Sequence, residues 1–201
     1  MKITCIAFAL GTLALSVHVP LHAVELGPEM RMDEPSRGGA AVSPSSRVTM
    51  CARTDEVVFS CPLDKSKKIA SICASSDTGS SKERFYYAYG HAGSPELTYP
   101  AVDQPSNDAF TRTHLGFAGN TGGYAYGFSN KGYKYTVYSI SGERNMQNAG
   151  VIVQNASNSK VVAKMQCQAG KITETESDPV IDATLKWKSD SGIESNGLPT
   201  R

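Results

Sequence analysis

The chain has 201 residues, with 20 Lys and Arg against 19 Asp and Glu, so its formal net charge is +1. This length accommodates one domain of about 100–150 residues with terminal tails. The near-neutral charge argues against a strong nucleic-acid binder, which shows a basic excess, and against an acidic solvating tail. Recognition of a partner must then depend on local shape and not on bulk charge.

Residues 1–23 have the three parts of a secretory signal peptide. Lys2 supplies the positive start, Ile6 to Val17 form an uncharged apolar run, and Ala23 is a small residue at the expected cleavage point. The run is too short to cross about 30 Å of hydrocarbon comfortably, so we expect cleavage and no membrane anchor. The sequence therefore predicts an exported protein.

Export makes disulfide bonds the expected use of the cysteines. Cys5 lies within the predicted signal peptide, which leaves Cys51, Cys61, Cys73 and Cys167. Four cysteines allow three pairings, among which sequence alone does not choose. We favour Cys61–Cys73 as a local staple and Cys51–Cys167 as a long-range tie. No pair has the Cys-x-x-Cys spacing of a zinc site, so we predict no metal.

The composition divides the rest of the chain into three parts. Residues 24–50 mix Pro, Gly, Ser and charges without apolar periodicity and predict a flexible lead-in. Residues 51–170 form the predicted folded domain, and 171–201 a polar tail. Within the tail, Asp-Pro at 178–179 is typical of a helix N-cap followed by proline at the first helical position. We predict one short helix near 179–188, which packs Trp187 onto the domain.

The domain is predicted to be all-β. Short runs rich in Val, Ile, Tyr and Phe alternate with turn residues, and no stretch has the sustained helical period that parallel α/β folds need. Eight or nine short antiparallel strands must close into a small barrel or pack as a two-sheet sandwich to bury one face. The predicted strands are Val57–Cys61, Lys68–Ala74, Arg84–Gly90, Glu96–Tyr99, His114–Ala118, Gly123–Ser129, Tyr133–Ser139, Gly150–Gln154 and Lys160–Cys167.

Tyrosine is concentrated in one part of this domain, because all nine tyrosines lie within residues 86–138. Tyr124 and Tyr126 alternate along one predicted strand, and Tyr133 and Tyr135 along the next. Such residues serve as core and cross-strand pairs, or as a partner-binding face, since tyrosine is enriched in interfaces. Opposite faces of the same strands can serve both purposes.

The turn between these two strands decides whether the two sets of tyrosines share a face. A two-residue Lys131-Gly132 loop puts both sets on one face. A three-residue loop that includes Asn130, with a glycine bulge, puts them on opposite faces and Tyr124 opposite Tyr138. The Asn-x-Gly order favours the bulged turn.

A polar loop follows the most aromatic strand. This kind of loop, at a strand end, inserts into another protein's cleft, although an ordinary connection is the alternative. With the four tyrosines above, its side chains complete the candidate partner-binding residues: Ser141, Glu143, Arg144, Asn145 and Gln147.

Candidate catalytic residues are few. Ser129 lies in a sequence that begins like a nucleophile elbow, but Lys131 stands where the second glycine belongs. His91 lies in a Gly-rich turn and His114 at the start of a strand. We predict no catalytic site and no cofactor, and a hydrolase using Ser129 or His114 is the enzymatic alternative.

Several short motifs are shared with a known family, over residues 59–167. They resemble a family of small exported proteins of Gram-negative bacteria, to whose pattern Cys51 is an addition. The resemblance implies a periplasmic location and a β fold, and no particular reaction. The motifs are Phe59-Ser60-Cys61, Lys67-Lys68, Ser71-Ile72-Cys73-Ala74-Ser75, Arg84-Phe85, Pro95-Glu96-Leu97, Tyr99-Pro100, Tyr135-Thr136-Val137-Tyr138, Ala149-Gly150-Val151 and Cys167.

The expected architecture is also similar to periplasmic lysozyme inhibitors and to immunity proteins against secreted antibacterial effectors. The inhibitors' Ser-Gly-x-x-Tyr loop has no counterpart, because the run from Ser141 to Arg144 continues to Asn145. We hypothesise a periplasmic inhibitor, specifically an immunity protein that occludes a secreted lipase, phospholipase or peptidoglycan hydrolase. The alternative is a structural or small-ligand-carrying envelope barrel, which needs an internal cavity where an inhibitor has a filled core.

Overall fold

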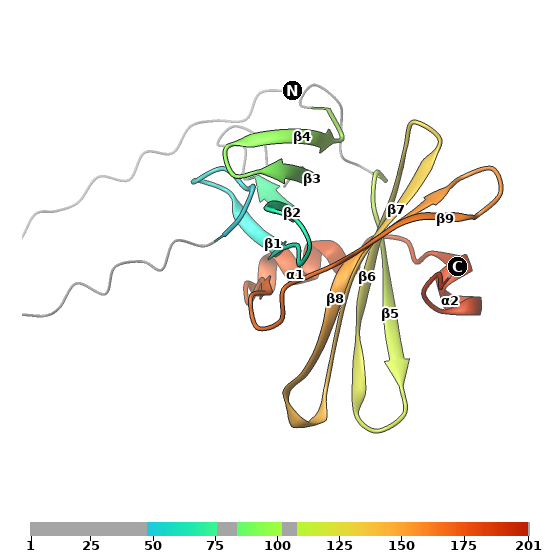
Figure 1. Cartoon of the computed structure of the whole chain (residues 1–201). Coiled ribbons are helices and arrows are strands. Elements are labelled where there is room, and N and C mark those ends of the chain that lie inside the picture. Colours follow the sequence, from blue (N-terminus) through green and yellow to red (C-terminus); the bar gives the residue numbers. More distant parts are fainter. Residues whose placement is uncertain (1–47, 76–83, 102–107, 201) are drawn as a thin grey trace, which may run out of the picture. The chain divides into compact units, whose positions relative to one another are not determined.

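The computed structural model describes residues 48–75, 84–101 and 108–200, all within the compact unit Val42–Arg201. The predicted signal peptide and most of the predicted lead-in lie outside the described residues. Strands dominate the rest (Figure 1). They are β1 (Glu56–Pro62), β2 (Lys68–Ser75), β3 (Arg84–His91), β4 (Ser94–Tyr99), β5 (Thr111–Phe117), β6 (Thr121–Asn130), β7 (Tyr133–Gly142), β8 (Met146–Asn155), β9 (Val161–Gln166) and β10 (Thr173–Glu174).

These strands form two antiparallel sheets of five, in the orders β10-β1-β2-β3-β4 and β5-β6-β7-β8-β9. The predicted all-β antiparallel fold is therefore confirmed, as a two-sheet sandwich and not a closed barrel. The nine predicted strands correspond to β1–β9. The two-residue strand β10 was not predicted, because it lies in the polar tail and gains its place by pairing with β1.

The turn between β6 and β7 is the two-residue version. Asn130 pairs with Tyr133, and both Lys131 (φ 48°) and Gly132 (φ 79°) have left-handed backbone, as a type I′ turn requires. The bulged turn favoured from the sequence is wrong. A type I′ turn matches the right-handed twist of the flanking strands, so the ladder continues without a bulge, and Tyr124 lies opposite Ser139.

This register puts an aromatic cluster between the sheets. The Phe128 ring lies 4.7 Å, centroid to centroid, from the stacked rings of both Tyr135 and Tyr99. Tyr87 of β3 and Phe110 approach the same ring at 4.9 and 5.5 Å. Because these rings come from both sheets, the cluster fills the interior of the sandwich.

The second sheet is covered on its outer face as well. Leu115, Tyr138, Ile140 and Ile152 form a separate buried cluster there with Ile193. Ile193 belongs to α2 (Ser191–Asn196), a helix that the sequence did not predict. The Asp190 carboxylate caps α2 by accepting from the backbone N–H of Gly192 and Ile193, and it pairs with Lys134 at 2.5 Å.

The predicted C-terminal helix is α1 (Asp178–Leu185), with Ser177 in the N-cap position that the sequence suggested for Asp178. Trp187 follows it and packs onto the core as predicted. Its ring stacks on Phe110 at 5.2 Å and meets Phe85 edge-on at 4.7 Å. With β10 and α2, the segment predicted as a polar tail is thus part of the folded unit.

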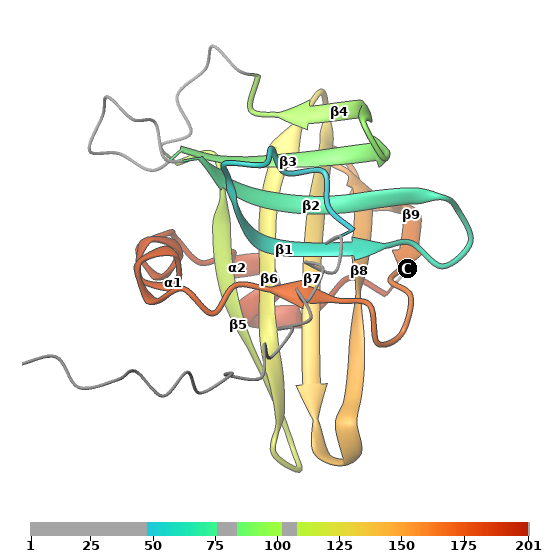
Figure 2. The same ribbon diagram turned by 90° about the vertical axis from the view of Figure 1, so that its left-hand side faces the viewer.

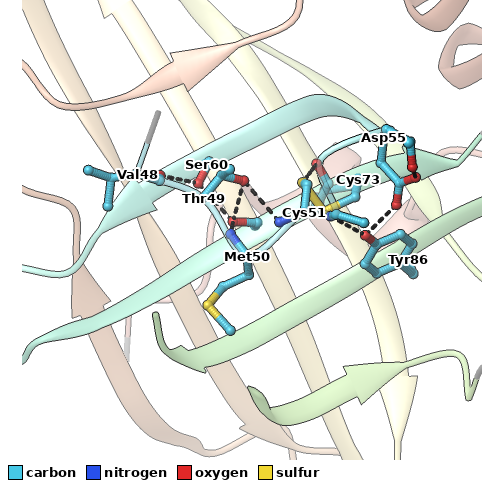
Figure 3. Close-up of a disulfide and its surroundings, with 12 residues drawn as sticks. Val48, Thr49, Met50, Cys51, Asp55, Ser60, Cys73 and Tyr86 are labelled. Atoms are coloured by element: carbon cyan, nitrogen blue, oxygen red, sulfur yellow. Dashed lines mark hydrogen bonds between the residues drawn. A yellow bond between two sulfur atoms is a disulfide. The ribbon is translucent and has the colours of Figure 1, made fainter. Parts of the chain in front are cut away.

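The described start of the chain lies on the outer face of the first sheet (Figure 3). The Val48 carbonyl accepts from Ser60 Oγ at 2.9 Å, and the Met50 N–H donates to Ser71 Oγ at 3.0 Å. Ser60 and Ser71 are both fully buried and lie 2.7 Å apart, Oγ to Oγ. Residues 48–50, which composition placed in the lead-in, therefore belong to the fold.

The expected two disulfides are present, but the favoured pairing is wrong. The bonds are Cys51–Cys73, with Cα atoms 5.5 Å apart, and Cys61–Cys167, at 5.6 Å. Cys61 lies opposite Ala70 in the β1–β2 ladder, three residues from Cys73. That offset is roughly 10 Å along the strands, beyond the reach of a disulfide.

The two bonds hold different contacts. Cys51–Cys73 fixes the start of the described chain to β2, whereas Cys61–Cys167 joins β1 of the first sheet to the residue that follows β9 of the second. The sequence separations are 22 and 106 residues. In the chain-entropy model the longer loop therefore stabilises the fold more.

We predict that replacing Cys61 and Cys167 together by alanine lowers the free energy of unfolding by about 5 kcal/mol, against about 3 kcal/mol for the Cys51 and Cys73 pair. Chemical denaturation of the two variants measures the difference. Peptide mapping of the non-reduced protein is the control, and recovery of a Cys61–Cys73 peptide would contradict the fold described here.

Tyr86 of β3 provides a second tether for the N-terminal segment (Figure 3). Its hydroxyl donates to Asp55 Oδ2 at 2.6 Å and accepts from the Ala52 N–H at 3.1 Å. Burial, together with the hydrogen bond to Asp55, raises the pKa of Tyr86 to about 12. In the unfolded chain a tyrosine titrates near pH 10.

We predict that Tyr86→Phe lowers the free energy of unfolding by about 1 kcal/mol at pH 7. As pH rises from 10 to 12, the unfolded chain releases the Tyr86 proton before the folded chain does, so this contribution to stability is lost across that window. Denaturation curves from pH 7 to 12 should fall less steeply for Tyr86→Phe than for the unaltered protein. Tyr133→Phe, at an exposed ring, is the control at pH 7, and an equal loss there would contradict the role of the hydroxyl.

Candidate functional site

The two sheets overlap over only part of the second one. Figure 2 shows β1–β4 crossing one half of the strands β5–β8, while the other half extends beyond them. That half ends in the β5–β6 connection (117–121) and the β7–β8 connection (141–147). The pairing of Gly122 with Ser141 places these two connections side by side. We call them the paired tips.

The β7–β8 tip contains the loop residues predicted to bind a partner. Ser141, Glu143, Arg144, Asn145 and Gln147 are all exposed. Residues 143–145 form a 3₁₀ turn in which Arg144 (φ 56°) and Asn145 (φ 59°) both have left-handed backbone. Asparagine tolerates this conformation, but a long side chain such as arginine pays a conformational cost. Strain of this kind gathers at functional sites.

The β5–β6 tip adds a residue that sequence reasoning missed. Phe117 is 51% exposed, and Met146 of the other tip is 38% exposed. The ladder places Phe117 opposite Thr121 and Met146 opposite Gly142, which neighbour each other across β6 and β7. Two large apolar side chains therefore lie on one face of the paired tips, beside the charged Glu143 and Arg144.

The four tyrosines predicted to bind a partner are placed differently. Tyr124, Tyr126 and Tyr135 share the inner face, where Tyr126 is only 6% exposed and the other two pack against the core cluster. Burial raises the pKa of Tyr126. Tyr133 is 40% exposed but lies beside the β6–β7 turn, at the other end of β7 from the tips. The other interpretation of the sequence, in which the strand tyrosines form core and cross-strand pairs, fits the positions of Tyr124, Tyr126 and Tyr135.

A buried arginine borders this region. Arg112 of β5 lies on the inner face, 9% exposed, with its guanidinium carbon 3.6 Å from the centroid of the Tyr124 ring. The guanidinium also approaches the Tyr126 hydroxyl and opposes the rise in the pKa of Tyr126 that burial causes. Tyr124 in turn meets His114 edge-on at 5.6 Å.

Two adjoining hollows are formed around these groups. A cleft of about 190 Å³ is lined by Arg112, Tyr124, Ser139 and Ser141 from the sheet and by Glu174 from β10. A more open hollow of about 430 Å³ continues toward the tips. Its lining consists of His114, Asn120, Gly122, Gly123, Tyr124, Ser141, Gly142 and Glu143.

The residues of the enzymatic alternative are not brought together. His114 pairs with Tyr124, whereas Ser129 lies five residues further along β6, next to the turn. The offset of five positions from Tyr124 is odd, so Ser129 faces the opposite side of the sheet from Tyr124. Five residues also correspond to roughly 17 Å along the strand.

In the part of the chain that the structure describes, no cluster of three or more His, Cys, Asp and Glu residues could hold a metal ion. The described helices include none that is long and apolar enough to cross a membrane. The comparisons with known proteins add no relative, because no family model, curated protein or solved structure matches the chain.

The floor of the open hollow depends on a glycine. A Cβ atom on Gly123 would lie 1.9 Å from the Ser139 carbonyl oxygen, so no other residue fits without moving the β6–β7 backbone. We predict that Gly123→Ala destabilises the protein by about 3 kcal/mol, measured by chemical denaturation. Gly116→Ala is the matched control, because its Cβ would meet only the His114 ring, at ordinary distances of 3.6 Å from Cε1 and 3.9 Å from Nδ1. Equal effects of the two substitutions would contradict this close approach.

Proposed function

We propose that this chain is a periplasmic protein-binding inhibitor that engages its partner through the paired tips. More specifically, we propose an immunity protein that occludes the active site of a secreted lipase, phospholipase or peptidoglycan hydrolase. The observation that carries it is the pair of exposed apolar side chains, Phe117 and Met146, on two hairpin ends that extend beyond the sandwich.

The chemistry of the paired tips suits protein recognition. Interfaces combine a few large apolar anchors with a charged rim, and Glu143 with Arg144 supply such a rim beside Phe117 and Met146. The tips continue a hydrogen-bonded ladder of four strands, so they lose little conformational freedom on binding. A loop held in this way can occupy another protein's cleft without being ordered first.

The interior of the sandwich favours an inhibitor over a ligand-carrying barrel. A carrier needs an enclosed apolar cavity inside the fold, whereas the centre of the space between these sheets is filled by the rings around Phe128. The hollows near the tips open at the surface. Ser129 and His114 also do not form a nucleophile–base pair with each other, because they lie apart on the second sheet.

Two disulfides are compatible with an oxidising compartment such as the periplasm. The resemblance of residues 59–167 to small exported proteins of Gram-negative bacteria supports the same location. The proposal assumes that the predicted signal peptide at 1–23 directs export to the periplasm.

The test is inhibition of candidate enzymes, starting with any lipase or muramidase encoded in the neighbouring reading frame. We expect equimolar protein to abolish activity, and the double variant F117S/M146S to weaken binding about 100-fold, because each exposed anchor is typically worth more than 1 kcal/mol in an interface.

Val162→Ser is the matched control, since Val162 is 52% exposed but lies on β9, away from the tips. Denaturation curves must show that both variants fold. Recovery of no stable enzyme partner from cell envelope, or full inhibition by F117S/M146S, would reject the proposal.

A further inference from the structure

We propose that the cleft around Arg112 is a binding site for a carboxylate group. Arg112 is 9% exposed, and its buried Nε has no hydrogen-bond partner among the described residues. None of the ion pairs formed within the described ranges includes Arg112. A buried charge without an ion-pair partner is unfavourable, so an anion bound in this cleft would supply the partner that the described residues do not.

The surroundings of Arg112 orient it for such a ligand. The Tyr124 ring covers one face of the guanidinium at 3.6 Å, a cation–π contact that leaves the edge of the group to form hydrogen bonds, one of them with the Tyr126 hydroxyl. The planar edge of a guanidinium matches the two oxygens of a carboxylate. Arg112 also lines the cleft wall that Tyr124, Ser139 and Ser141 continue, so its side chain borders the space a ligand would fill.

The remaining lining selects a small monoanion. Ser139 and Ser141 line the cleft, and a serine hydroxyl can donate to a carboxylate oxygen. Thr175 lines it as well, but its hydroxyl already donates to Glu56 Oε1 at 3.4 Å. Glu174 borders it too, and its negative charge opposes a dianion such as phosphate more than a singly charged carboxylate. The volume of about 190 Å³ accepts a carboxylate with a short stem, and the rest of a larger ligand would extend into the open hollow beside His114.

This inference does not depend on the protein-binding proposal, because it concerns Arg112 and the cleft behind the tips, which shares only Ser141 with the paired tips. The carboxylate can belong to a small molecule or to a peptide. The chemistry that Arg112 recognises is the same in both cases, so the experiment contains probes for each source.

The test is an NMR titration of the ¹⁵N-labelled, disulfide-bonded chain with acetate, acetamide and inorganic phosphate. We expect acetate to shift the backbone amide signals of Gly123, Ser139 and Ser141 in a saturable way. Acetamide should leave them unchanged, and phosphate should bind more weakly than acetate. Shifts that rise linearly with acetate, or tighter binding of phosphate, would overturn the proposal.

Substitutions connect the signal to the cleft. Arg112→Lys keeps the charge but loses the two-pronged geometry, so acetate affinity should fall at least 10-fold. Glu174→Gln removes the opposing charge and should tighten acetate binding several-fold. Because Glu174 is exposed, this variant decides the question even if Arg112→Lys does not fold. Unchanged acetate affinity in Glu174→Gln would count against the site.

Arg53→Lys is the matched control, since Arg53 is exposed on the segment that precedes β1 and should not affect acetate binding. A blocked tripeptide with a free C-terminal carboxylate, compared with its amide, then identifies the source. Binding tighter than acetate would assign the site to a peptide end, and equal affinity to a small carboxylate. Binding of the amide as tight as that of the acid would reject carboxylate recognition.

Discussion

The β6–β7 register, set by the two-residue turn at Lys131 and Gly132, is the constraint on which the rest of the molecule depends. Side chains alternate between faces, so a slip of one residue would send Phe128 to the outer face of its sheet. In the observed register Phe128 lies opposite Tyr135, and their rings stack almost parallel. The first sheet then packs Tyr87 and Tyr99 onto this platform. The contact between the sheets therefore depends on the register that this local turn sets.

The aromatic contact around Phe128 also determines which part of the second sheet is left uncovered by the first sheet. Because the sheets cross near Phe128, next to the β6–β7 turn, the opposite ends of β5–β8 lie beyond the first sheet (Figure 2). The outer face of these strands would be exposed too, but Ile193 of α2 covers the cluster around Leu115 and Ile140. The molecule thus has a stable junction at one end of the long strands and free hairpin tips at the other.

The strands could be predicted from the sequence because their signals are local. Alternating apolar residues and turn residues predicted all nine of β1–β9. The Asp-Pro pair at 178–179 predicted a helix near 179–188, which in the structure ends at Leu185, before Trp187. The disulfide pairing could not be obtained in this way, because it depends on which residues face each other across β1 and β2. The register at the β6–β7 turn was misjudged for a similar reason: both turn types use the same residues, and only the backbone distinguishes them.

The site shows where alternation misleads. In β5 the residues Thr113, Leu115 and Phe117 share one face, and this pattern suggests that Arg112 faces solvent. Both faces of this sheet are covered, however, so Arg112 is enclosed under β10 and α1. No signal within the strand reveals the second layer, because β10 and α1 come from a segment whose composition is polar. The burial of Arg112 follows from tertiary structure alone.

The small residues at the tip end of the inner face explain why a hollow is formed there. Toward the tips, the row that follows Tyr124 contains Gly116, Gly122 and Ser141 on β5–β7, which have little or no side chain to fill space, and Gln147 on β8. Glycine weakens a strand because it loses more backbone freedom on folding, so two glycines in one row are a cost to stability. In return, the small residues leave open space between the buried Arg112 and the exposed tips. In a hydrophobic core, large side chains would fill this row. Here the small residues keep the cleft accessible from the paired tips.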